Sequence, residues 1–515
     1  MTAAAPVGGP PQTLTARTWS GLRWTYLSSV LSGGMQLIYT ASTSRLLGPQ
    51  AFGLMALAQL TVNFSIYFAQ MGVGQALIQK PDLTRDDVRA GFTSSVVLGS
   101  LVTAVLWLGA PAIAALFDKP DVVGVVRWLS WTFVLTGFGN TARSLLRREL
   151  RFRELAIAET AAYLLGYLVV GLGMAVAGYG VWSLVGAVLS ANVFGTAFKY
   201  ALDRHALVPL VHLDPYRRLY GYGARVSVIN FLEYWGNNID TAAVGRYAAT
   251  AVLGQYNRAF YLVNLPLTYL TQSLSTVLFS SFSRIQDDRE RLGRVYIGVI
   301  GVAAALLAPV CIGLGVAAQE VVLVVLGPQW DVAATVVPVL TLAAVWNVLS
   351  RFAGIVCEAR AELNRKLALQ GGYLVLLVGL MALAVGRDLR FYAGALALGE
   401  LIRHGLYLRL LRRVIGQPVR RQLRAYLPAL FTTAVTVAAI ALTRLGLSTA
   451  GAPVLVVFAL ELAAGSLALI AAIRLGPVSA MRGELRHRLS SAGVLRRGGG
   501  SVSKAAALLV GEPRS

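Results

Sequence analysis

The chain has 515 residues, of which 56% are hydrophobic, and 46 Lys and Arg against 24 Asp and Glu give a formal net charge of +22. A nucleic-acid-binding protein concentrates such a charge on one soluble face. Here the charge is divided among short gaps between hydrophobic stretches, so we expect no nucleic-acid partner. Cys311 and Cys357 both lie in apolar stretches, and we expect no disulfide, no metal site and no cofactor.

Fourteen hydrophobic stretches follow one another along the chain, and each is close to the ~20 residues that a helix needs to cross a bilayer. They lie at 22–44, 52–79, 92–117, 122–142, 155–177, 179–198, 222–245, 259–283, 295–317, 332–357, 367–385, 391–411, 425–443 and 451–473. The predicted fold class is an all-α polytopic membrane protein with about fourteen transmembrane helices.

The basic residues alternate in density from one gap to the next. The chain ends and the even-numbered gaps hold 38 of the 46, the odd-numbered gaps hold six, and Arg127 and Arg258 lie within or at the edge of helices. This is the positive-inside pattern, which predicts a multi-pass protein of the cytoplasmic (inner) membrane with both termini in the cytoplasm. We also expect the basic loops to attract anionic lipids.

The two ends of the chain differ from the rest in composition. Residues 1–19 are rich in Pro, Gly and Thr and lack the apolar core of a signal peptide, so the first membrane helix is expected to direct insertion. Residues 476–515 are basic, and we expect them to be disordered and to rest on the cytoplasmic leaflet.

The gaps between the stretches are short. The longest on the outer side, about 318–331, has some 14 residues, and the acidic pairs Asp86–Asp87 and Asp287–Asp288 fall in short loops crowded with Arg. A membrane glycosyltransferase or polymerase normally needs an ordered loop or domain for its catalytic groups, and the sequence has neither a nucleotide-binding loop nor a metal-ligand spacing. The sequence therefore favours translocation over catalysis, and we predict no catalytic residue.

Two windows of the sequence align without a gap at an offset of 201 residues, one starting at Arg45 and the other at Arg246. The matched pairs are Gln36/Asn237, Gly53/Gly254 and Asn63/Asn264 at this offset, and Pro120/Pro328 and Arg143/Arg351 at an offset of 208. Each half would hold six helices, so the halves are predicted to be parallel lobes that rock about a central cleft.

The repeat also sets the predicted domain boundaries. They are a cytoplasmic N-terminal segment at 1–19, an N-lobe at 20–202, an inter-lobe linker at 203–219, a C-lobe at 220–416, two extra helices at 417–475 and the basic cytoplasmic tail at 476–515. The two extra helices lie outside the repeat, and the sequence does not indicate their role.

A stripe of polar side chains marks the seventh hydrophobic stretch. Asn230, Glu233, Asn237 and Asp240 are spaced by 3, 4 and 3 residues, which places them on one helical face. Charged groups at this depth cost roughly 2.5–3.5 kcal/mol each on insertion scales, so the stripe favours a water-filled cleft. The alternatives are interhelical hydrogen bonds and, for Asp240, an ion pair with Arg246 or Arg258.

Other charges in the apolar stretches are less specific. Glu400, Arg403 and His404 have the spacing of one helical face and are expected to neutralise one another. Glu461 stands alone and must be protonated or paired, with no partner evident from the sequence. Arg127 either meets a phosphate in the cleft or snorkels outward.

Several motifs together resemble those of Wzx-type polysaccharide-exporting flippases, a branch of the multidrug/oligosaccharidyl-lipid/polysaccharide exporter superfamily. They are Arg45-x-Leu47-Gly48-Pro49-x-x-Phe52-Gly53, Asn237-x-x-Asp240, Gly245-Arg246, Leu253-Gly254-x-Tyr256, Pro266, Ser283-Arg284-x-Gln286-Asp287-Asp288 and Leu326-Gly327-Pro328-x-Trp330. The resemblance covers about 20–475 and departs from the pattern at Asn257, where the branch more often has a small residue.

The resemblance implies a flippase that carries an undecaprenyl-diphosphate-linked oligosaccharide to the outer leaflet by alternating access. Its products would serve surface polysaccharide synthesis of the lipopolysaccharide, exopolysaccharide or teichuronic type, and the polysaccharide polymerase machinery would be a partner. A cation-coupled small-molecule antiporter of the same superfamily is the alternative. The sugar, the coupling ion or voltage drive, and the oligomeric state do not follow from the sequence.

Candidate site residues follow from the chemistry of this substrate. Forked donors suit a diphosphate, whereas amides and aromatic rings suit sugars. The diphosphate candidates are Arg23, Arg127, Arg225 and Arg258. The cleft candidates are Gln36, Asn63, Asn230, Glu233, Tyr234, Trp235, Asn237, Asp240 and Asn264, of which Glu233 and Asp240 are also candidates for ion coupling.

Overall fold

A computed structural model of the chain describes residues 14–70, 73–80, 82–210, 231–449 and 451–475. Within these ranges the regular elements are helices, as the sequence predicts. Predictions that concern Arg225, Asn230 or the basic tail lie outside the described residues. The chain divides into two compact units, Met1–Phe231 and Leu232–Ser515, which we call the N-unit and the C-unit.

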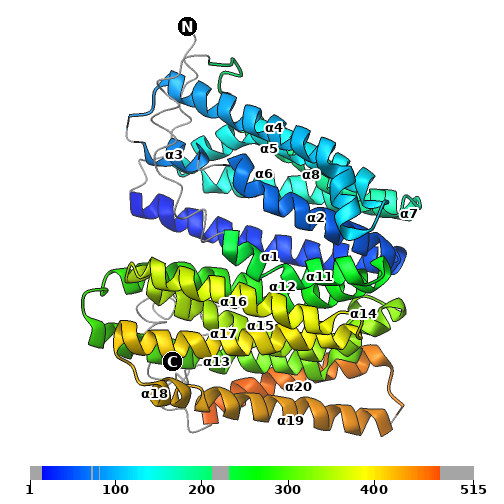
Figure 1. Ribbon diagram of the computed structural model, residues 1–515, viewed down its shortest axis with the longest axis vertical. Helices are drawn as coiled ribbons and strands as arrows, with labels where there is room; N and C mark the ends of the chain where they lie inside the picture. The colour runs from blue at the N-terminus through cyan, green and yellow to red at the C-terminus, as the bar shows by residue number, and fades with distance from the viewer. Residues whose placement is uncertain (1–13, 71–72, 81, 211–230, 450, 476–515) are drawn as a thin grey trace. The chain divides into compact units, whose positions relative to one another are not determined.

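The N-unit is a bundle of long helices with short connections (Figure 1). Its elements are α1 (Leu14–Leu46), α2 (Pro49–Gln70), α3 (Val73–Gln79), α4 (Arg85–Phe117), α5 (Val122–Arg148), α6 (Phe152–Tyr163), the π-helical η1 (Leu164–Gly171), α7 (Leu172–Val176) and α8 (Val181–Leu202). Glycine brings α4 and α5 together, because a Cβ on Gly99 would lie 2.4 Å from the carbonyl oxygen of Phe133.

The C-unit is also helical throughout its described residues. Its elements are α11 (Ile239–Tyr247), α12 (Thr250–Ser283), α13 (Arg289–Val316), α14 (Ala318–Val325), η2 (Pro328–Trp330), α15 (Asp331–Ala359), α16 (Leu363–Ala384), α17 (Leu389–Ile415), α18 (Val419–Arg424), α19 (Leu427–Thr449) and α20 (Val454–Leu475). The helix α15 packs against α12, α13 and α17, and the hairpin of α19 and α20 packs on α13 and α14.

Ten helices in the described part of the chain are long and apolar enough to cross a membrane, which fits a multi-pass membrane protein. The stretches 22–44, 259–283 and 391–411 form α1, α12 and α17, which are not among the ten. These helices carry many of the polar side chains discussed above, including Gln36, Asn264 and Glu400. The total of fourteen spans stays a prediction.

The seventh hydrophobic stretch does not continue as one helix. Residues 231–236 are helical, a turn follows at Asn237 and Asn238, and α11 begins at Ile239. The amide groups of Asn237 and Asn238 donate to the carbonyl oxygens of Glu233 and Tyr234, each at 2.8 Å. Such side-chain bonds compete with helical bonding, so the single polar face predicted from Asn230 to Asp240 is interrupted at its middle.

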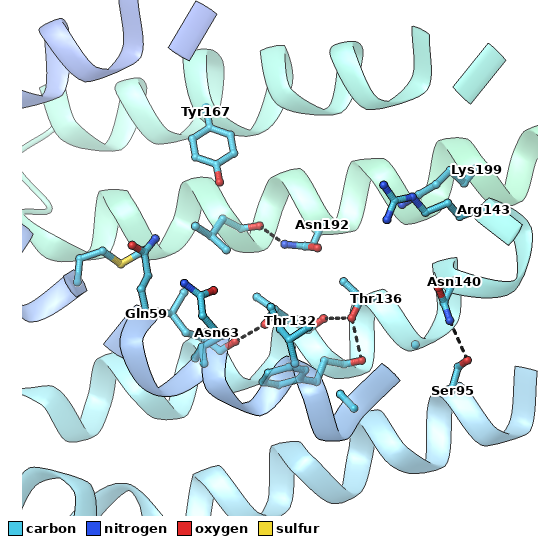
Figure 2. A pocket seen from close by; sticks show the side chains of 18 residues that line it. Gln59, Asn63, Ser95, Thr132, Thr136, Asn140, Arg143, Tyr167, Asn192 and Lys199 are labelled. Carbon is cyan, nitrogen blue, oxygen red and sulfur yellow. Dashed lines mark hydrogen bonds between the residues drawn. The ribbon is translucent and has the colours of Figure 1, made fainter. Parts of the chain in front are cut away.

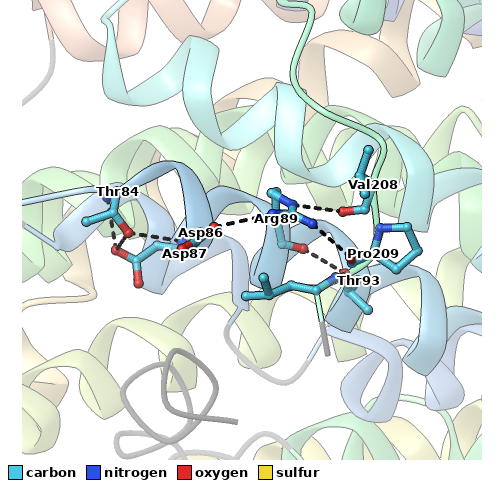
Figure 3. A network of polar contacts seen from close by, with 8 residues as sticks. Thr84, Asp86, Asp87, Arg89, Thr93, Val208 and Pro209 are labelled. Carbon is cyan, nitrogen blue, oxygen red and sulfur yellow. Dashed lines mark hydrogen bonds and ion pairs between the residues drawn. The ribbon is translucent and has the colours of Figure 1, made fainter. Parts of the chain in front are cut away.

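The first part of the predicted linker is bound to the N-unit, as Figure 3 shows. The guanidinium of Arg89 donates to the carbonyl oxygens of Val208 (3.3 Å) and Pro209 (3.1 Å), and the backbone amide of Leu210 donates to Thr93 (3.0 Å). A capping box between Thr84 and the neighbouring Asp87 fixes the start of α4. Residues 203–210 therefore belong structurally to the N-unit.

Candidate functional site

The N-unit contains an open cavity of about 310 Å³ between α2, α4, α5, η1 and α8 (Figure 2). Its polar lining side chains are Gln59, Asn63, Ser95, Thr132, Thr136, Asn140, Arg143, Tyr167, Asn192 and Lys199. No carboxylate is among the described residues that line it. We call it the N-cavity.

Helical periodicity places these side chains on inward faces. On α5 the residues Thr132, Thr136, Asn140 and Arg143 are spaced by 4, 4 and 3, so that they share one face. On α2, Gln59 and Asn63 are four residues apart, and on α8 the pair Asn192 and Lys199 is separated by seven. Three helices therefore each contribute a polar stripe to one space.

Two of the side-chain amides that line the N-cavity are held by hydrogen bonds, and two are not. The amide of Asn140 donates to the hydroxyl of Ser95 at 3.2 Å, and that of Asn192 donates to the carbonyl oxygen of Val188 at 2.8 Å. The side chains of Gln59 and Asn63 have no hydrogen-bond partner among the residues that the structure describes, and both are solvent-exposed. They remain available to a polar ligand.

The cations gather at one end of the N-cavity. Arg143 and Lys199 lie together in Figure 2, whereas Gln59 and Asn63 lie toward the other end. An ion pair joins Arg143 to Glu159 on α6 at 3.2 Å, with both side chains about 40% exposed (41% and 42%). One acidic group does not neutralise two cations, so this end of the cavity keeps a net positive charge.

The C-unit has a smaller pocket of about 30 Å³, with room for about one or two water molecules. Its lining residues are Gly236, Asn237, Phe260, Asn264, Leu340, Ala343, Ala344, Asn347, Leu396 and Glu400. Asn347 donates to Asn237 (3.3 Å) and to Glu400 (3.0 Å), and Tyr373 also donates to Glu400 (2.9 Å). Arg403 completes the network as the ion-pair partner of Glu400 at 2.6 Å, as predicted, whereas the third member of the predicted patch, His404, contacts Ser350 and Tyr426 instead.

The two pockets occupy equivalent positions of the internal repeat. Six lining pairs keep the offsets found in the sequence: Gln59/Phe260 and Asn63/Asn264 at 201, and Thr132/Leu340, Thr136/Ala344, Val188/Leu396 and Asn192/Glu400 at 208. The C-unit replaces Gln59 with a phenylalanine and two threonines with apolar residues, and its pocket is smaller. The repeat is thus visible in the pockets as well as in the sequence.

The predicted coupling residues have defined partners. Glu233 forms an ion pair with Lys366 at 2.5 Å, and Lys366, which is only 3% exposed, is shared with Glu358. Asp240 is 1% exposed and accepts a hydrogen bond from Tyr256 at 2.7 Å, while its other carboxyl oxygen has no partner among the described residues. The partner of Asp240 is therefore a tyrosine, and the ion pair with Arg246 or Arg258 does not form.

The structure divides the other predicted site residues between several places. Asn63 lines the N-cavity, and Asn237 and Asn264 line the C-unit pocket. Gln36 lies half-buried on α1, and Tyr234 and Trp235 make an edge-on ring contact at 5.9 Å; none of these three lines either pocket.

Of the predicted diphosphate arginines, the two whose side chains the structure describes, Arg127 and Arg258, line neither pocket. Arg127 donates to the carbonyl oxygen of Trp107 at 3.1 Å and lies over its ring, and Arg258 lies over the ring of Tyr261 at 4.9 Å. Arg23 lies within α1, and its side chain is outside the described part of the structure.

Sequence reasoning missed the two cations of the N-cavity. Arg143 and Lys199 were counted with the cytoplasmic loops, because both stand close to the ends of hydrophobic stretches. The structure places Arg143 within α5, five residues before its end, and Lys199 in the last turn of α8, and both line the N-cavity. The 4, 4, 3 spacing from Thr132 to Arg143 is the signal that points to Arg143, and the spacing of seven from Asn192 is the corresponding signal for Lys199.

A multi-pass helical bundle with polar cavities inside repeat-related halves is the architecture of a membrane transporter. Residues 43–335 match the model of the family described as "Polysaccharide biosynthesis protein". This is more than half of the chain, and the protein belongs to that family.

Individual relatives agree with this assignment. The lipopolysaccharide biosynthesis protein WzxC of Escherichia coli (strain K12) is 25% identical over 392 residues, which are 73% of this chain and 78% of that protein. The succinoglycan biosynthesis transport protein ExoT of Rhizobium meliloti (strain 1021) is 27% identical over 335 residues, which are 64% and 67% of the two chains. The predicted resemblance to Wzx-type proteins is confirmed.

A solved structure shares the fold. The lipid II flippase MurJ in its inward closed conformation superposes with a TM-score of 0.68 at 12% identity, covering 88% of this chain and 97% of that one. At this identity the likeness concerns the fold alone, and it agrees with the predicted fold class.

Proposed function

We propose that this protein is a flippase that moves an oligosaccharide linked to undecaprenyl diphosphate from the cytoplasmic to the outer leaflet of the bacterial cytoplasmic membrane. The headgroup would pass through the polar interior while the lipid tail stays in the bilayer. Support comes from the family, from relatives named for lipopolysaccharide and succinoglycan biosynthesis, and from a fold shared with a lipid II flippase.

The observation that carries the proposal is the lining of the N-cavity, which combines two cations with several amides and hydroxyls and has no carboxylate among its described lining residues. Phosphate oxygens accept strong charge-assisted hydrogen bonds from Arg and Lys. Sugar hydroxyls both donate and accept, as do the amides of Gln59 and Asn63. The cavity therefore offers both chemistries that such a headgroup requires.

The cavity size restricts what it can hold. At about 310 Å³ it lies at the lower end of the ~300–1000 Å³ range of ligand pockets. We infer that it takes only part of the headgroup, with phosphate beside Arg143 and Lys199 and a sugar toward Gln59 and Asn63. The rest of the oligosaccharide would lie outside it.

The alternative, an antiporter for cationic molecules, requires carboxylates in the binding cavity. Glu400 is the one carboxylate that lines either described pocket, and it is already paired with Arg403 at 2.6 Å. A positively charged N-cavity would repel a cationic substrate. The electrostatics thus favour an anionic one.

The membrane potential supplies a sufficient driving force. Two negative charges that move outward across an inside-negative membrane gain roughly 4–5 kcal/mol per 100 mV. If an ion is coupled as well, Asp240 is the better candidate, because it is buried with one unpartnered oxygen, whereas Glu233 is held by Lys366. Asp240→Asn would then reduce export without reducing the amount of protein in the membrane.

The test uses purified protein and export in cells. Arg143→Ala and Lys199→Ala should each reduce surface polysaccharide strongly, and Arg143→Lys should restore only part of it, because Lys keeps the charge and loses the forked geometry. The matched control is Arg294→Ala, since Arg294 is 58% exposed and pairs only with Glu290. Undecaprenyl-diphosphate sugars should raise the Tm of the wild type more than cationic dyes do. Greater stabilisation by dyes, with both cavity cations dispensable, would establish the antiporter instead.

A further inference from the structure

Glu461 is a buried carboxyl group in the helical hairpin outside the repeat. It lies on α20, seven residues after the first residue of that helix, and is only 1% exposed. Neither of its carboxyl oxygens has a hydrogen-bond partner among the residues that the structure describes. The transport mechanism proposed above does not use this residue.

Two helices pack against α20 near this point, and each brings one charged group. The helix α14 carries Glu320, which is 9% exposed, and α19 carries Arg444. Arg444 forms an ion pair with Glu320 at 3.1 Å and donates to the side chain of Gln319 at 2.5 Å and to the carbonyl oxygen of Val316 at 3.3 Å. The other charged residue of the three helices, Arg474, lies in the last turn of α20.

This arrangement leaves no counter-charge for Glu461. Arg444 and Glu320 already neutralise each other, so an ionised Glu461 would add an uncompensated negative charge in a buried place. A carboxylate without hydrogen-bond donors is strongly disfavoured in such surroundings, whereas a protonated carboxyl group is neutral. The geometry therefore favours the protonated form.

We propose that Glu461 is a proton-binding site that controls the attachment of α14 to α19. With its proton bound, Glu461 leaves the Arg444–Glu320 ion pair intact. When the proton is released to water, the new carboxylate competes with Glu320 for Arg444 and weakens the contact between α14 and α19. This inference concerns the two helices outside the repeat and does not depend on the proposed substrate.

The first experiment measures the Tm of the purified full-length protein from about pH 6 to about pH 9, where an exposed carboxyl group no longer titrates. Glu461→Gln mimics the protonated form, so the Tm of this variant should exceed that of the wild type least at the lowest pH, and the difference should grow by several degrees toward high pH. Glu320→Gln should lower the Tm at every pH, because it leaves Arg444 unpaired. Glu290→Gln changes an exposed pair and is the matched control. A Tm for Glu461→Gln below the wild type at every pH would overturn the proposal.

A second experiment does not require any variant of Glu461. Arg444→Gln should destabilise the protein, because Glu320 loses its partner. The double variant Arg444→Gln/Glu320→Gln lacks both charges of the ion pair. A neutral Glu461 does not depend on the positive charge of Arg444, so the stability should return toward that of the wild type. An ionised Glu461 would instead be left as the one buried charge, and the double variant would stay as unstable as Arg444→Gln. That outcome would show that Glu461 does not hold a proton.

Discussion

Asn192 and Glu400 stand 208 residues apart and line the pockets of the two units from equivalent helices. The amide of Asn192 binds a carbonyl oxygen of its own helix, whereas Glu400 is held by Asn347, Tyr373 and Arg403. One position of the repeat is therefore neutral and the other is the centre of an ionic network. Together with the apolar replacements of Gln59, Thr132 and Thr136, this change separates a pocket with free amides from one whose polar groups are held by their own contacts.

Asp240 gives a test at the same scale. Tyr256→Phe removes the hydroxyl that donates to Asp240 at 2.7 Å and deprives a buried carboxyl group of its side-chain donor. We expect this variant to lose about 1–3 kcal/mol of stability and to show a lower Tm. Asp240→Asn keeps an acceptor oxygen and should be milder. Tyr179→Phe, at an exposed tyrosine, is the control. A Tyr256→Phe variant as stable as the wild type would contradict the assigned hydrogen bond.

At the scale of elements, the close contact of α4 and α5 predicts opposite effects for two glycines of one helix. A Cβ at Gly99 would lie 2.4 Å from the carbonyl oxygen of Phe133, whereas a Cβ at Gly109 would meet nothing within 4 Å. Gly99→Ala should therefore destabilise the protein by about 1–3 kcal/mol. Gly109→Ala should be neutral or stabilise it by up to ~1 kcal/mol, because alanine is the better helix former. Equal Tm values for the two variants would contradict the packing of α4 on α5.

The docked segment at 203–210 should depend on pH through His205. Burial lowers the pKa of His205 below its usual 6.5, and the ring packs beside Phe92 and Tyr200. The folded state therefore binds this proton less readily than the unfolded state, so the contribution to stability is complete above pH 6.5 and declines as the pH falls below that value. Burial raises the pKa of Asp203, so the folded state binds this proton more readily than the unfolded state does. The contribution of Asp203 to stability is therefore complete below pH 3.8 and declines as the pH rises above that value.

Hydrogen exchange of residues 203–210 provides the measurement. Protection, corrected for intrinsic exchange rates, should fall between about pH 7 and about pH 5 in the wild type. His205→Asn cannot gain a proton and should lose this dependence. Arg89→Ala removes the hydrogen bonds to Val208 and Pro209 and should lower protection at every pH. Protection that is unchanged in Arg89→Ala would show that other contacts hold the segment.

The sequence predicted the helical fold well, because the signal is large: long apolar stretches have few alternatives to helices in a bilayer. The repeat was also recoverable, since offsets of 201 and 208 recur among the pocket residues. The site was predicted only in part. A charged residue near the end of a helix can lie in a loop or face the interior of the bundle. From the sequence, Arg143 and Lys199 were predicted to lie in the loops. The interruption at Asn237 was missed because periodicity alone does not reveal where side-chain amides compete with the backbone.

At the scale of the whole molecule, the charge pattern predicts one orientation of the chain in the membrane. Of the 46 basic residues, 38 fall at the chain ends or in even-numbered gaps and six in the odd-numbered ones. Arg143 and Lys199 now belong to the N-cavity, but removing two residues from the larger group leaves the bias intact. The positive-inside rule counts short loops near helix ends, and all of these gaps qualify. Both termini are therefore still predicted to lie in the cytoplasm.

Reporter fusions test this orientation directly. Fusions after residues 215, 288 and 417 should report the cytoplasm, and those after 249 and 328 should report the outer side. The most informative pair is 249 and 288, which flank α12, a helix that is not among the ten most apolar spans. If both report the same side, α12 does not cross the membrane. The C-unit would then hold an odd number of crossings before α19, and the parallel relation between the two halves would be lost. Opposite sides would keep that relation, and with it the equivalence of the two pockets, while the site assignment itself rests on the lining of the N-cavity.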